Sequence, residues 1–378
     1  MQPSVSVQFA WHGAPWQRAR TGVSLHGHTS HSRETLDFIP RVAARVPVVR
    51  DMVRAQEAKY RSLHGRELSY FDAWWTPPLG PREALAVERK QIEDLGLRSL
   101  VSITDHDNVE APLLLRVLPE GRNTPVSVEW TVHYRGIILH VGVHNLPPRR
   151  ANQCMAALAE FTAHPQEEEL EGILAWLCEE PDTLIVLNHP YWDEKGVGRQ
   201  KHNSIAEEFL QRYRPFIHAL ELNGIRPWSE NRRVAALAES LERPVISGGD
   251  RHCCESNALI NLTNSETFAE FVEEVRDYGR SHVLVMPQYR EPIVARILKM
   301  ISDVMRDNEA HTHGWVRWTD RVFYRDAKTG AVESLSSVWP DQRLPLVVRA
   351  FASACLLLES RGLQAALRQL APPAQELA

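Results

Sequence analysis

Apolar positions along the chain follow two periods that alternate with each other. Short apolar and β-branched runs, typical of buried strands, occur at residues 22–26, 99–103, 126–128, 136–143, 183–187, 216–220, 244–246 and 282–286. Segments with a helical spacing of apolar residues lie between them, at 81–95, 151–163, 167–180, 229–242 and 266–279. This alternation, repeated about seven times, predicts a parallel β/α architecture. Residues 1–20 show neither period and are expected to form an irregular arm.

Histidine and acidic residues stand at or just beyond the C-terminal ends of the predicted strands. The set comprises His26, His28, Asp105, His106, Glu129, His189, Asp250 and His252. His140 differs from them because it lies inside its predicted strand. The C-terminal ends of parallel strands in a barrel meet on one face, so we expect these side chains to converge there.

The global composition excludes several classes of protein. A length of 378 residues fits one large domain or two smaller ones. The net charge of −5 gives no electrostatic reason to expect nucleic-acid binding across the whole surface. We expect no signal peptide, and no apolar run approaches the roughly 20 residues that cross a bilayer. The five cysteines are odd in number and include no CxxC pair, which favours a reduced, cytosolic protein.

The converging residue types suggest a catalytic metal cluster. Imidazole and carboxylate together suit zinc, iron or manganese, and the absence of cysteine from the set argues against a closed structural zinc site. The ligands exceed the needs of one ion, so we expect two or three divalent ions with a bridging carboxylate. Such a cluster lowers the pKa of a bound water toward ~7, and the resulting metal-bound hydroxide can attack phosphorus.

The ordered series HGHTSH, ITDHD, VSVEW, ILHVGVH, LNHP, ELNG and SGGDRH resembles the PHP (polymerase and histidinol phosphatase) family over about residues 20–290. The resemblance implies a distorted seven-stranded, TIM-like β/α barrel. It also implies a trinuclear site and phosphoesterase activity.

The resemblance assigns the predicted ligands to three ions. The first ion has His26, His28, Glu129 and Asp250. The second has the bridging Glu129 together with His140 and His189. The third has His106, His252 and a residue of the loop after His28. Asp105 is expected to orient a ligand.

The loop after His28 departs from the pattern of the family, which usually ends in Ser-Asp-Gly. Here it reads Ser32-Arg33-Glu34. Either Glu34 or His31 replaces the aspartate, or the third ion binds weakly. Arg33 is then a candidate for contact with a substrate phosphate. A second departure is Ser24, which stands where the family usually has an aspartate and is expected to alter only the support of the ligands.

A phosphorylated substrate needs positive charge in addition to metal, and arginine can bind phosphate bidentately. Arg251 within the Asp-Arg-His motif is assigned, with Asp105, to catalysis. Arg226 and the loop residues Arg199 and Lys201 are further candidates for substrate binding, against the alternative of ordinary surface charge.

A small phosphomonoester is the first candidate substrate, and a nucleotide or short oligonucleotide is the second. The second rests on an insertion at about 38–80, where a basic helical stretch precedes Tyr70, Trp74 and Trp75. A solvated helix face is the alternative explanation of the basic stretch. Two further alternatives remain for the protein as a whole: hydrolysis of an amide or lactone on the same ions, and a non-catalytic, metal-stabilised assembly module.

The sequence therefore predicts a barrel over residues 20–290, with a helical insertion, and a mostly helical accessory region over 291–378. Within the barrel, 136–143 is a candidate hairpin partner of 126–128. Within the accessory region we expect a hairpin around Thr329 and Gly330 and a helix over 345–370. His311 and His313 repeat the opening spacing but are expected to lie in a solvated turn. The accessory region is equally compatible with a cap over the site and with an oligomer contact.

Overall fold

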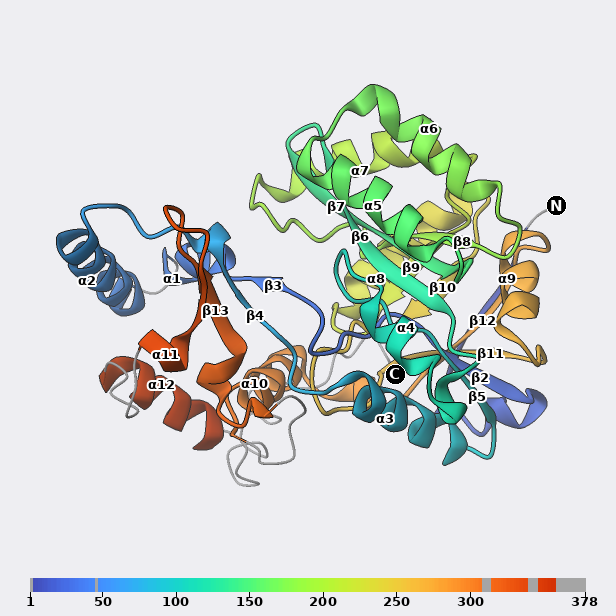
Figure 1. Ribbon diagram of the computed structural model, residues 1–378. Coiled ribbons are helices and arrows are strands. Elements are labelled where there is room, and N and C mark those ends of the chain that lie inside the picture. Colours follow the sequence, from blue (N-terminus) through green and yellow to red (C-terminus); the bar gives the residue numbers. More distant parts are fainter. Residues whose placement is uncertain (1–2, 45–46, 308–313, 339–345, 358–378) are drawn as a thin grey trace.

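The structure is a computed structural model that describes residues 3–44, 47–307, 314–338 and 346–357. Within these residues the fold is mixed α/β, with three β-sheets, two of five strands and one of four. The two five-stranded sheets and the helices around them form the body of the molecule, and the four-stranded sheet belongs to a lobe beside it (Figure 1).

The first five-stranded sheet has the order β1-β12-β11-β2-β5. Its strands are β1 (Ser4–Phe9), β2 (Thr21–Ser24), β5 (Arg98–Val101), β11 (Leu259–Thr263) and β12 (Arg280–Val285). β2 runs parallel to β5 and β1 runs parallel to β12, whereas β11 is antiparallel to both of its neighbours. β1 corrects the expectation of an irregular arm, because alternate residues of its sequence SVSVQF suit a strand that can pair along β12.

The second five-stranded sheet has the order β10-β9-β8-β7-β6. Its strands are β6 (Val126–Tyr134), β7 (Ile137–Leu146), β8 (Leu184–Asn188), β9 (Ala219–Asn223) and β10 (Val245–Gly248). β8, β9 and β10 are parallel, as the alternation predicts. β6 and β7 form an antiparallel hairpin, which confirms the pairing that the sequence suggests.

The two sheets approach each other at the ends of their strands. An isolated bridge joins His106, beyond β5, to Glu129 on β6, and a second joins Gly27 to Arg251. β10 also contacts β11 and β12. Within the described residues, however, no sheet closes on itself, so the predicted closed seven-stranded barrel is not shown. β11 departs from the predicted parallel order because it is antiparallel to both of its neighbours, whereas the antiparallel pairing of β7 with β6 agrees with the predicted hairpin.

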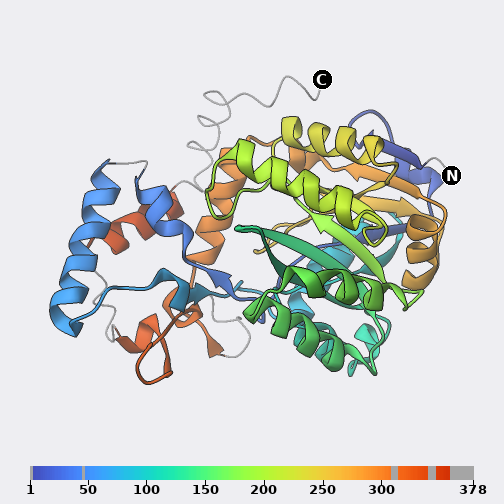
Figure 2. The same cartoon turned by 90° about the horizontal axis from the view of Figure 1, so that it is seen from above.

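Helices cover the outer faces of both sheets (Figure 2). They are α3 (Pro81–Glu93), α4 (Glu110–Leu115), α5 (Ala151–Ala163), α6 (Glu167–Cys178), α7 (Arg199–Tyr213), α8 (Trp228–Ser240) and α9 (Phe268–Arg276). α9 illustrates how the sequence sets an element: Thr267 and Glu270 form a capping box at its start, and Phe271 and Val275 are buried on one face. The largest core cluster packs Trp130 of β6 and Tyr134 against rings from α5 and α7.

The third sheet joins two segments that are far apart in the sequence. Its order is β14-β13-β4-β3, and its strands are β3 (Glu34–Thr35), β4 (Ala73–Trp75), β13 (Val322–Arg325) and β14 (Val332–Ser334). Its neighbouring helices are α1 (Phe38–Ala44), α2 (Pro47–His64), α10 (Ile293–Val304), α11 (Leu335–Val338) and α12 (Leu346–Leu357). We call these strands and helices together the accessory lobe (Figures 1 and 2).

The accessory lobe meets some of the expectations. The insertion is helical at first, as expected, but ends in a strand of the third sheet. The hairpin predicted around Thr329 and Gly330 is confirmed, because β13 pairs with β14. The expected helix over 345–370 is present at α12, and its later part lies outside the described residues, as do His311 and His313. In the described part of the chain, no helix combines the length and the apolar character that crossing a bilayer requires.

Candidate metal centre

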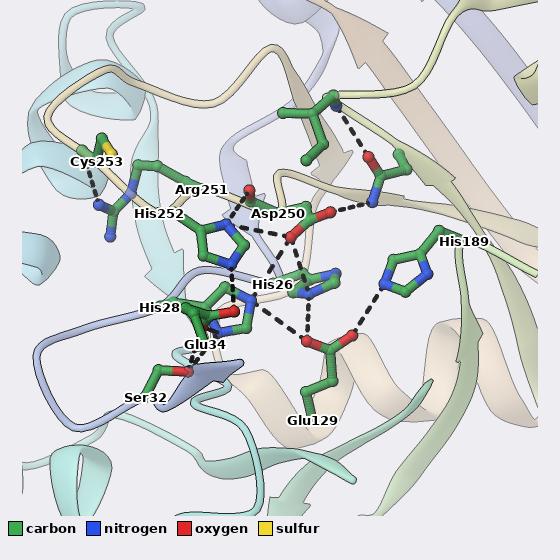
Figure 3. Close-up of polar contacts among 12 residues, drawn as sticks. His26, His28, Ser32, Glu34, Glu129, His189, Asp250, Arg251, His252 and Cys253 are labelled. Atoms are coloured by element: carbon green, nitrogen blue, oxygen red, sulfur yellow. Dashed lines mark hydrogen bonds and ion pairs between the residues drawn. The ribbon is translucent and has the colours of Figure 1, made fainter. Parts of the chain in front are cut away.

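The buried carboxylate of Glu129 lies at the centre of the cluster, on β6. Five imidazoles surround its oxygens at 2.9 to 3.5 Å: His26, His28, His106, His140 and His189. Figure 3 shows three of them, His26, His28 and His189. They come from the ends of β2, β5 and β8 and from within β7. The convergence expected from the strand ends is therefore present, although the sheets do not close into a barrel.

The potential ligand atoms form four overlapping groups, and the atoms of each group lie within 4.8 Å of one another. The groups are His26–His28–Glu129, His26–His189–Asp250, His106–Glu129–His140 and His28–Glu34–His106–His252. All nine residues that the sequence assigns to metal binding belong to these groups. Because the groups share members, the geometry resembles one extended centre more than separate sites.

Three of these residues hold an unusual backbone conformation. The φ angles are 62° at His26, 26° at His189 and 52° at Asp250. Positive φ is uncommon for residues other than glycine and is often found where the surrounding structure fixes a functional side chain. Here the strain turns each side chain inward at the point where its strand ends.

Hydrogen bonds on the outer side of the cluster fix which imidazole nitrogen faces inward. His26 Nδ1 donates to Glu221 Oε1 at 2.9 Å, which directs Nε2 toward Glu129. His252 Nδ1 donates to the carbonyl oxygen of Asp250 at 2.9 Å, so its Nε2 faces Glu34. Partners of this kind set the orientation and basicity of metal-binding histidines. Gly248 leaves the room for Glu221, because a Cβ at Gly248 would overlap the Glu221 carboxylate.

The loop after His28 presents Glu34 to the cluster and turns His31 away from it. Glu34 Oε2 lies 3.3 Å from His252 Nε2 and 3.4 Å from His106 Nε2. Ser32 Oγ donates to Glu34 Oε1 at 2.7 Å and orients the carboxylate. His31 instead lies 3.0 Å from Glu110 on α4. The geometry therefore favours Glu34 over His31 as the replacement for the missing aspartate.

The electrostatics of the cluster keep its carboxylates ionised. Burial alone would raise the pKa of Glu129, but His26, His106 and His140 outweigh burial and hold the pKa well below its usual range. Burial likewise opposes the shift at Glu34, where His252 and His106 hold the pKa well below its usual range. The same carboxylates raise the pKa values of His26 and His106 despite their burial, so a divalent ion that binds here would displace the protons that imidazole and carboxylate share.

The donor set fits divalent ions. His28 Nε2 is buried and has no hydrogen-bond partner among the described residues, although it lies 3.3 Å from Glu129 Oε2. An unpartnered buried nitrogen is costly unless another group satisfies it. A cation between His28 and the carboxylates would do so. Imidazole and carboxylate ligands without cysteine suit zinc, manganese or iron.

The two residues assigned to catalysis from the sequence occupy supporting positions. Both carboxylate oxygens of Asp105 accept from Thr29, one from the backbone N–H at 2.5 Å and one from Oγ1 at 2.7 Å. Asp105 therefore holds the loop after His28, as an orienting residue would. Arg251 is buried and points away from the cluster, because its guanidinium pairs with Glu88 of α3 and donates to the Cys253 carbonyl at 2.6 Å (Figure 3). Arg251 thus connects α3 to the loop after β10.

Arg226 is the predicted substrate-binding arginine that the structure places beside the cluster. Its guanidinium carbon lies 3.7 Å from the centre of the Trp192 ring. Its Nε is buried without a partner among the described residues. Burial lowers the pKa of Arg226, while Asp250, Glu230 and Glu221 act in the opposite direction. Arg226 thus offers a stacked, partly unsatisfied cation next to the cluster.

The other candidate cations lie further out. Arg33 is exposed and lies over the ring of Trp74, 5.3 Å from its centre. Arg199 and Lys201 are exposed at the start of α7, and no described contact joins them to the cluster. Their positions agree with ordinary surface charge.

Sequence reasoning missed Glu194 and Glu88. Glu194 Oε2 lies 3.1 Å from His140 Nε2. Burial alone would raise the pKa of Glu194, but His140 outweighs burial and the pKa falls to about 2. A pocket beside it is lined by His140, His189 and Trp192. Glu194 follows the His189 motif by five residues, and no spacing rule marks it as part of the site.

Comparison with known proteins gives weak similarity only. No family model matches the chain, and no curated protein matches it in sequence. An amidohydrolase from Chromobacterium violaceum, solved with sulfate and no metal, has a TM-score of 0.34 and 15% identity over 47% of this chain and 84% of its own. A protein from Bifidobacterium adolescentis, assigned as a metal-dependent phosphoesterase, has a TM-score of 0.36 and 13% identity over 52% and 91%. PsfC from Pseudomonas syringae has a TM-score of 0.38 and 15% identity over 75% and 99%. Similarity at this level is no basis for transferring a function.

Proposed function

We propose that the protein is a metal-dependent hydrolase that cleaves phosphate esters at the Glu129 cluster. The observation that carries the proposal is the set of four overlapping ligand groups, which includes nine imidazole and carboxylate side chains. A structural metal site is usually closed by four ligands. A larger, shared set is typical of centres that hold two or more ions for hydrolysis. Divalent ions bound there would acidify a water and stabilise the charge that develops on a phosphoryl group.

The residues of the chain supply the remaining functions that such a reaction requires. Glu221 and Asp105 hold His26 and the Thr29 loop in place, so the cluster is organised before a substrate arrives. Arg226, which stacks on Trp192, offers a binding position for the substrate's phosphate. The guanidinium can donate to two phosphate oxygens while its stacking on the indole keeps its orientation.

A small phosphomonoester remains the first candidate substrate. Arg226 supports this candidate, because it stacks on Trp192 and interacts electrostatically with Asp250 and Glu221, and a single cation suits a single phosphate group. A nucleotide remains the second candidate because the exposed Arg33, which directly precedes Glu34, lies over the half-buried ring of Trp74 on the accessory lobe.

The experiment is a hydrolysis assay of the purified protein reloaded with Mn²⁺ or Zn²⁺. The panel contains p-nitrophenyl phosphate, bis(p-nitrophenyl) phosphate, p-nitrophenyl acetate and a simple lactone. We expect turnover of the monoester that is lost on chelation and lost in His189→Ala, since His189 lies 3.1 Å from Glu129. His164→Ala is the matched control, because His164 is an exposed histidine that forms a surface pair with Glu160.

The other outcomes distinguish the alternatives. Turnover of the acetate or lactone without turnover of any phosphate would show a carbonyl hydrolase. Bound ions without turnover of a broader set of esters would favour a non-catalytic assembly module.

A further inference from the structure

The four side chains of one ligand group come from two different parts of the molecule. His28 and His106 stand at the ends of β2 and β5 in the body. Glu34 belongs to β3, which is an edge strand of the third sheet and therefore part of the accessory lobe. The fourth member, His252, lies in the loop after β10.

The accessory lobe fixes the position of Glu34 through backbone pairing. β3 has only two residues and pairs with β4, so that Glu34 lies opposite Trp75. Leu36 N donates to Ala73 O at 3.0 Å and extends the pairing. A two-residue strand has no stability of its own and keeps its place only while its neighbour is present. β4 in turn lies between β3 and β13.

The position of Glu34 also depends on the C-terminal segment, which contributes β13. β13 pairs with β4 over Val322–Tyr324, and Thr76 N donates to Arg321 O at 2.9 Å. β13 thus holds β4, and β4 holds Glu34. Glu34, which completes this ligand group, is therefore positioned by β4 and β13, about 40 and 290 residues downstream. Strand register decides which face of a sheet a side chain points to, so this pairing directs the Glu34 carboxylate.

The lobe also contacts the loop that carries His252. Cys253 Sγ donates to the carbonyl oxygen of Met300 on α10 at 3.3 Å. The ring of Trp75 lies 6.0 Å from the ring of His252, centre to centre. Two of the four ligands in this group therefore lie against the accessory lobe, one by main-chain pairing and one by side-chain contact.

The other ligand groups do not depend on the lobe in this way. His26, His140, His189 and Glu129 stand on the two five-stranded sheets or at their ends. Their contacts with one another and with Glu221 lie within the body. Separation of the lobe would consequently remove one ion position and leave the others.

We infer that the accessory lobe is a positioning element for one ion, the ion held by His28, Glu34, His106 and His252. The inference rests on the proposed function only in that the cluster binds divalent ions. It assigns a role to both the insertion and the C-terminal region: pairing of β13 with β4 completes the ligand set.

The experiment measures bound Mn²⁺ per chain by elemental analysis and the affinity of each ion by calorimetric titration. Glu34→Gln removes the ligand charge but keeps the shape of the side chain. Phe323→Pro removes a backbone N–H from the middle of β13, which is a central strand, and should unpair β4. Val332→Pro is the matched control, because Val332 is the first residue of the edge strand β14, where proline is tolerated. Circular dichroism and thermal melting establish that each variant remains folded.

We expect three ions on the wild-type protein and on Val332→Pro. Glu34→Gln and Phe323→Pro should each weaken one ion by at least ~10-fold and leave two ions at wild-type affinity, since even the loss of a group that orients a metal ligand costs about 10- to 100-fold in metal affinity. The two retained ions show that the body is intact in each variant, which a general loss of structure would not allow.

Fewer than three ions on the wild-type protein, or wild-type affinity for all ions in Phe323→Pro, would overturn the inference. Equal weakening of all ions in Phe323→Pro would also overturn it. Three ions without hydrolysis of any phosphate ester would overturn the proposed function alone. A complete absence of bound ions would overturn both.

Discussion

At the scale of single residues, the buried carboxylates of the cluster are each engaged by several imidazoles. Five imidazoles lie within 3.5 Å of the Glu129 carboxylate, and the side-chain amide Nδ2 of Asn188 donates to it at 2.9 Å. Without those partners a carboxylate at this depth would take up a proton. The arrangement therefore ties the ionisation of the site to its full set of neighbours, and loss of one neighbour is expected to affect the others.

Arg226 should contribute to substrate affinity and not to ion binding. Arg226→Gln removes the cation but keeps a polar side chain, so KM for a phosphomonoester should rise by about 10- to 100-fold, since a hydrogen bond to a charged group contributes ~1.5–3 kcal/mol. Arg233→Gln is the control, because Arg233 stacks in the same way on Tyr191. Steady-state kinetics together with metal analysis check the result. A KM equal to that of Arg233→Gln would remove Arg226 from the binding site.

His218 should make stability depend on pH. Burial lowers the pKa of His218 to about 3, with help from Arg276, and its Nδ1 accepts from Ile185 N at 2.9 Å. The unfolded chain has a pKa near ~6.5 at this position. Between the two values the unfolded state binds the extra proton, so stability is lost as the pH falls below ~6.5.

The loss attributable to this histidine is about 2 kcal/mol between pH 7 and pH 5. Urea unfolding of the wild-type protein and of His218→Asn at both pH values measures it, because asparagine can still accept from Ile185 N and does not titrate. We expect the wild-type protein to lose about 2 kcal/mol more than the variant. Parallel losses would show that His218 is not the titrating group.

At the scale of elements, α3 supports the loop with the Asp-Arg-His motif through a buried ion pair. Glu88 on α3 pairs with Arg251 and also accepts from Ser24 Oγ and Asn257 Nδ2, each at 2.7 Å. Ser24 thus hydrogen-bonds a carboxylate that another element supplies. The pair connects α3, the end of β2 and the loop after β10.

Breaking this pair should be strongly destabilising. Glu88→Ala leaves the buried Arg251 without its counter-ion, and we expect a loss of roughly 3–5 kcal/mol in the free energy of unfolding. Lys90→Ala on the same helix breaks an exposed pair with Asp94 and should cost under ~1 kcal/mol. Chemical denaturation of both variants checks the difference. Equal losses of unfolding free energy in the two variants would mean that the buried Glu88–Arg251 pair contributes no more to stability than the exposed Lys90–Asp94 pair.

The elements that the sequence predicts well are those whose signal is local. Apolar residues recur at clear intervals in the parallel strands and in the helices α3, α5, α6, α8 and α9. The ligand residues converge because they stand at the strand ends, which themselves converge. β11 is missed although it is an apolar strand, because no helix separates it from β10 and the alternation of strand and helix therefore does not predict it.

The directions of side chains that depend on distant partners could not be predicted. Arg251 and Arg226 stand next to comparable motifs, yet a glutamate 163 positions away in sequence turns Arg251 from the cluster. The choice between Glu34 and His31 likewise depends on β4 and β13. The described residues do not show the closed barrel that the resemblance implies, and the alternation of elements could not predict that β11 runs antiparallel to both of its neighbours.

At the scale of the whole molecule, the body and the accessory lobe meet at the cluster. The body supplies most of the ligands from two sheets, and the lobe supplies Glu34 and the contacts around His252 (Figure 3). This arrangement explains why an insertion and a C-terminal region that share one sheet occur in the same chain. The cluster is thus the point at which all three sheets come together.

The central claim is that the cluster around Glu129 binds divalent ions. Anomalous diffraction from crystals grown with Mn²⁺, recorded on both sides of the manganese edge, tests it most directly. We expect peaks bounded by His26, His28, Glu129, His189 and Asp250, with a further peak beside Glu34 and His252. A difference map with no manganese peak among these side chains would contradict the account.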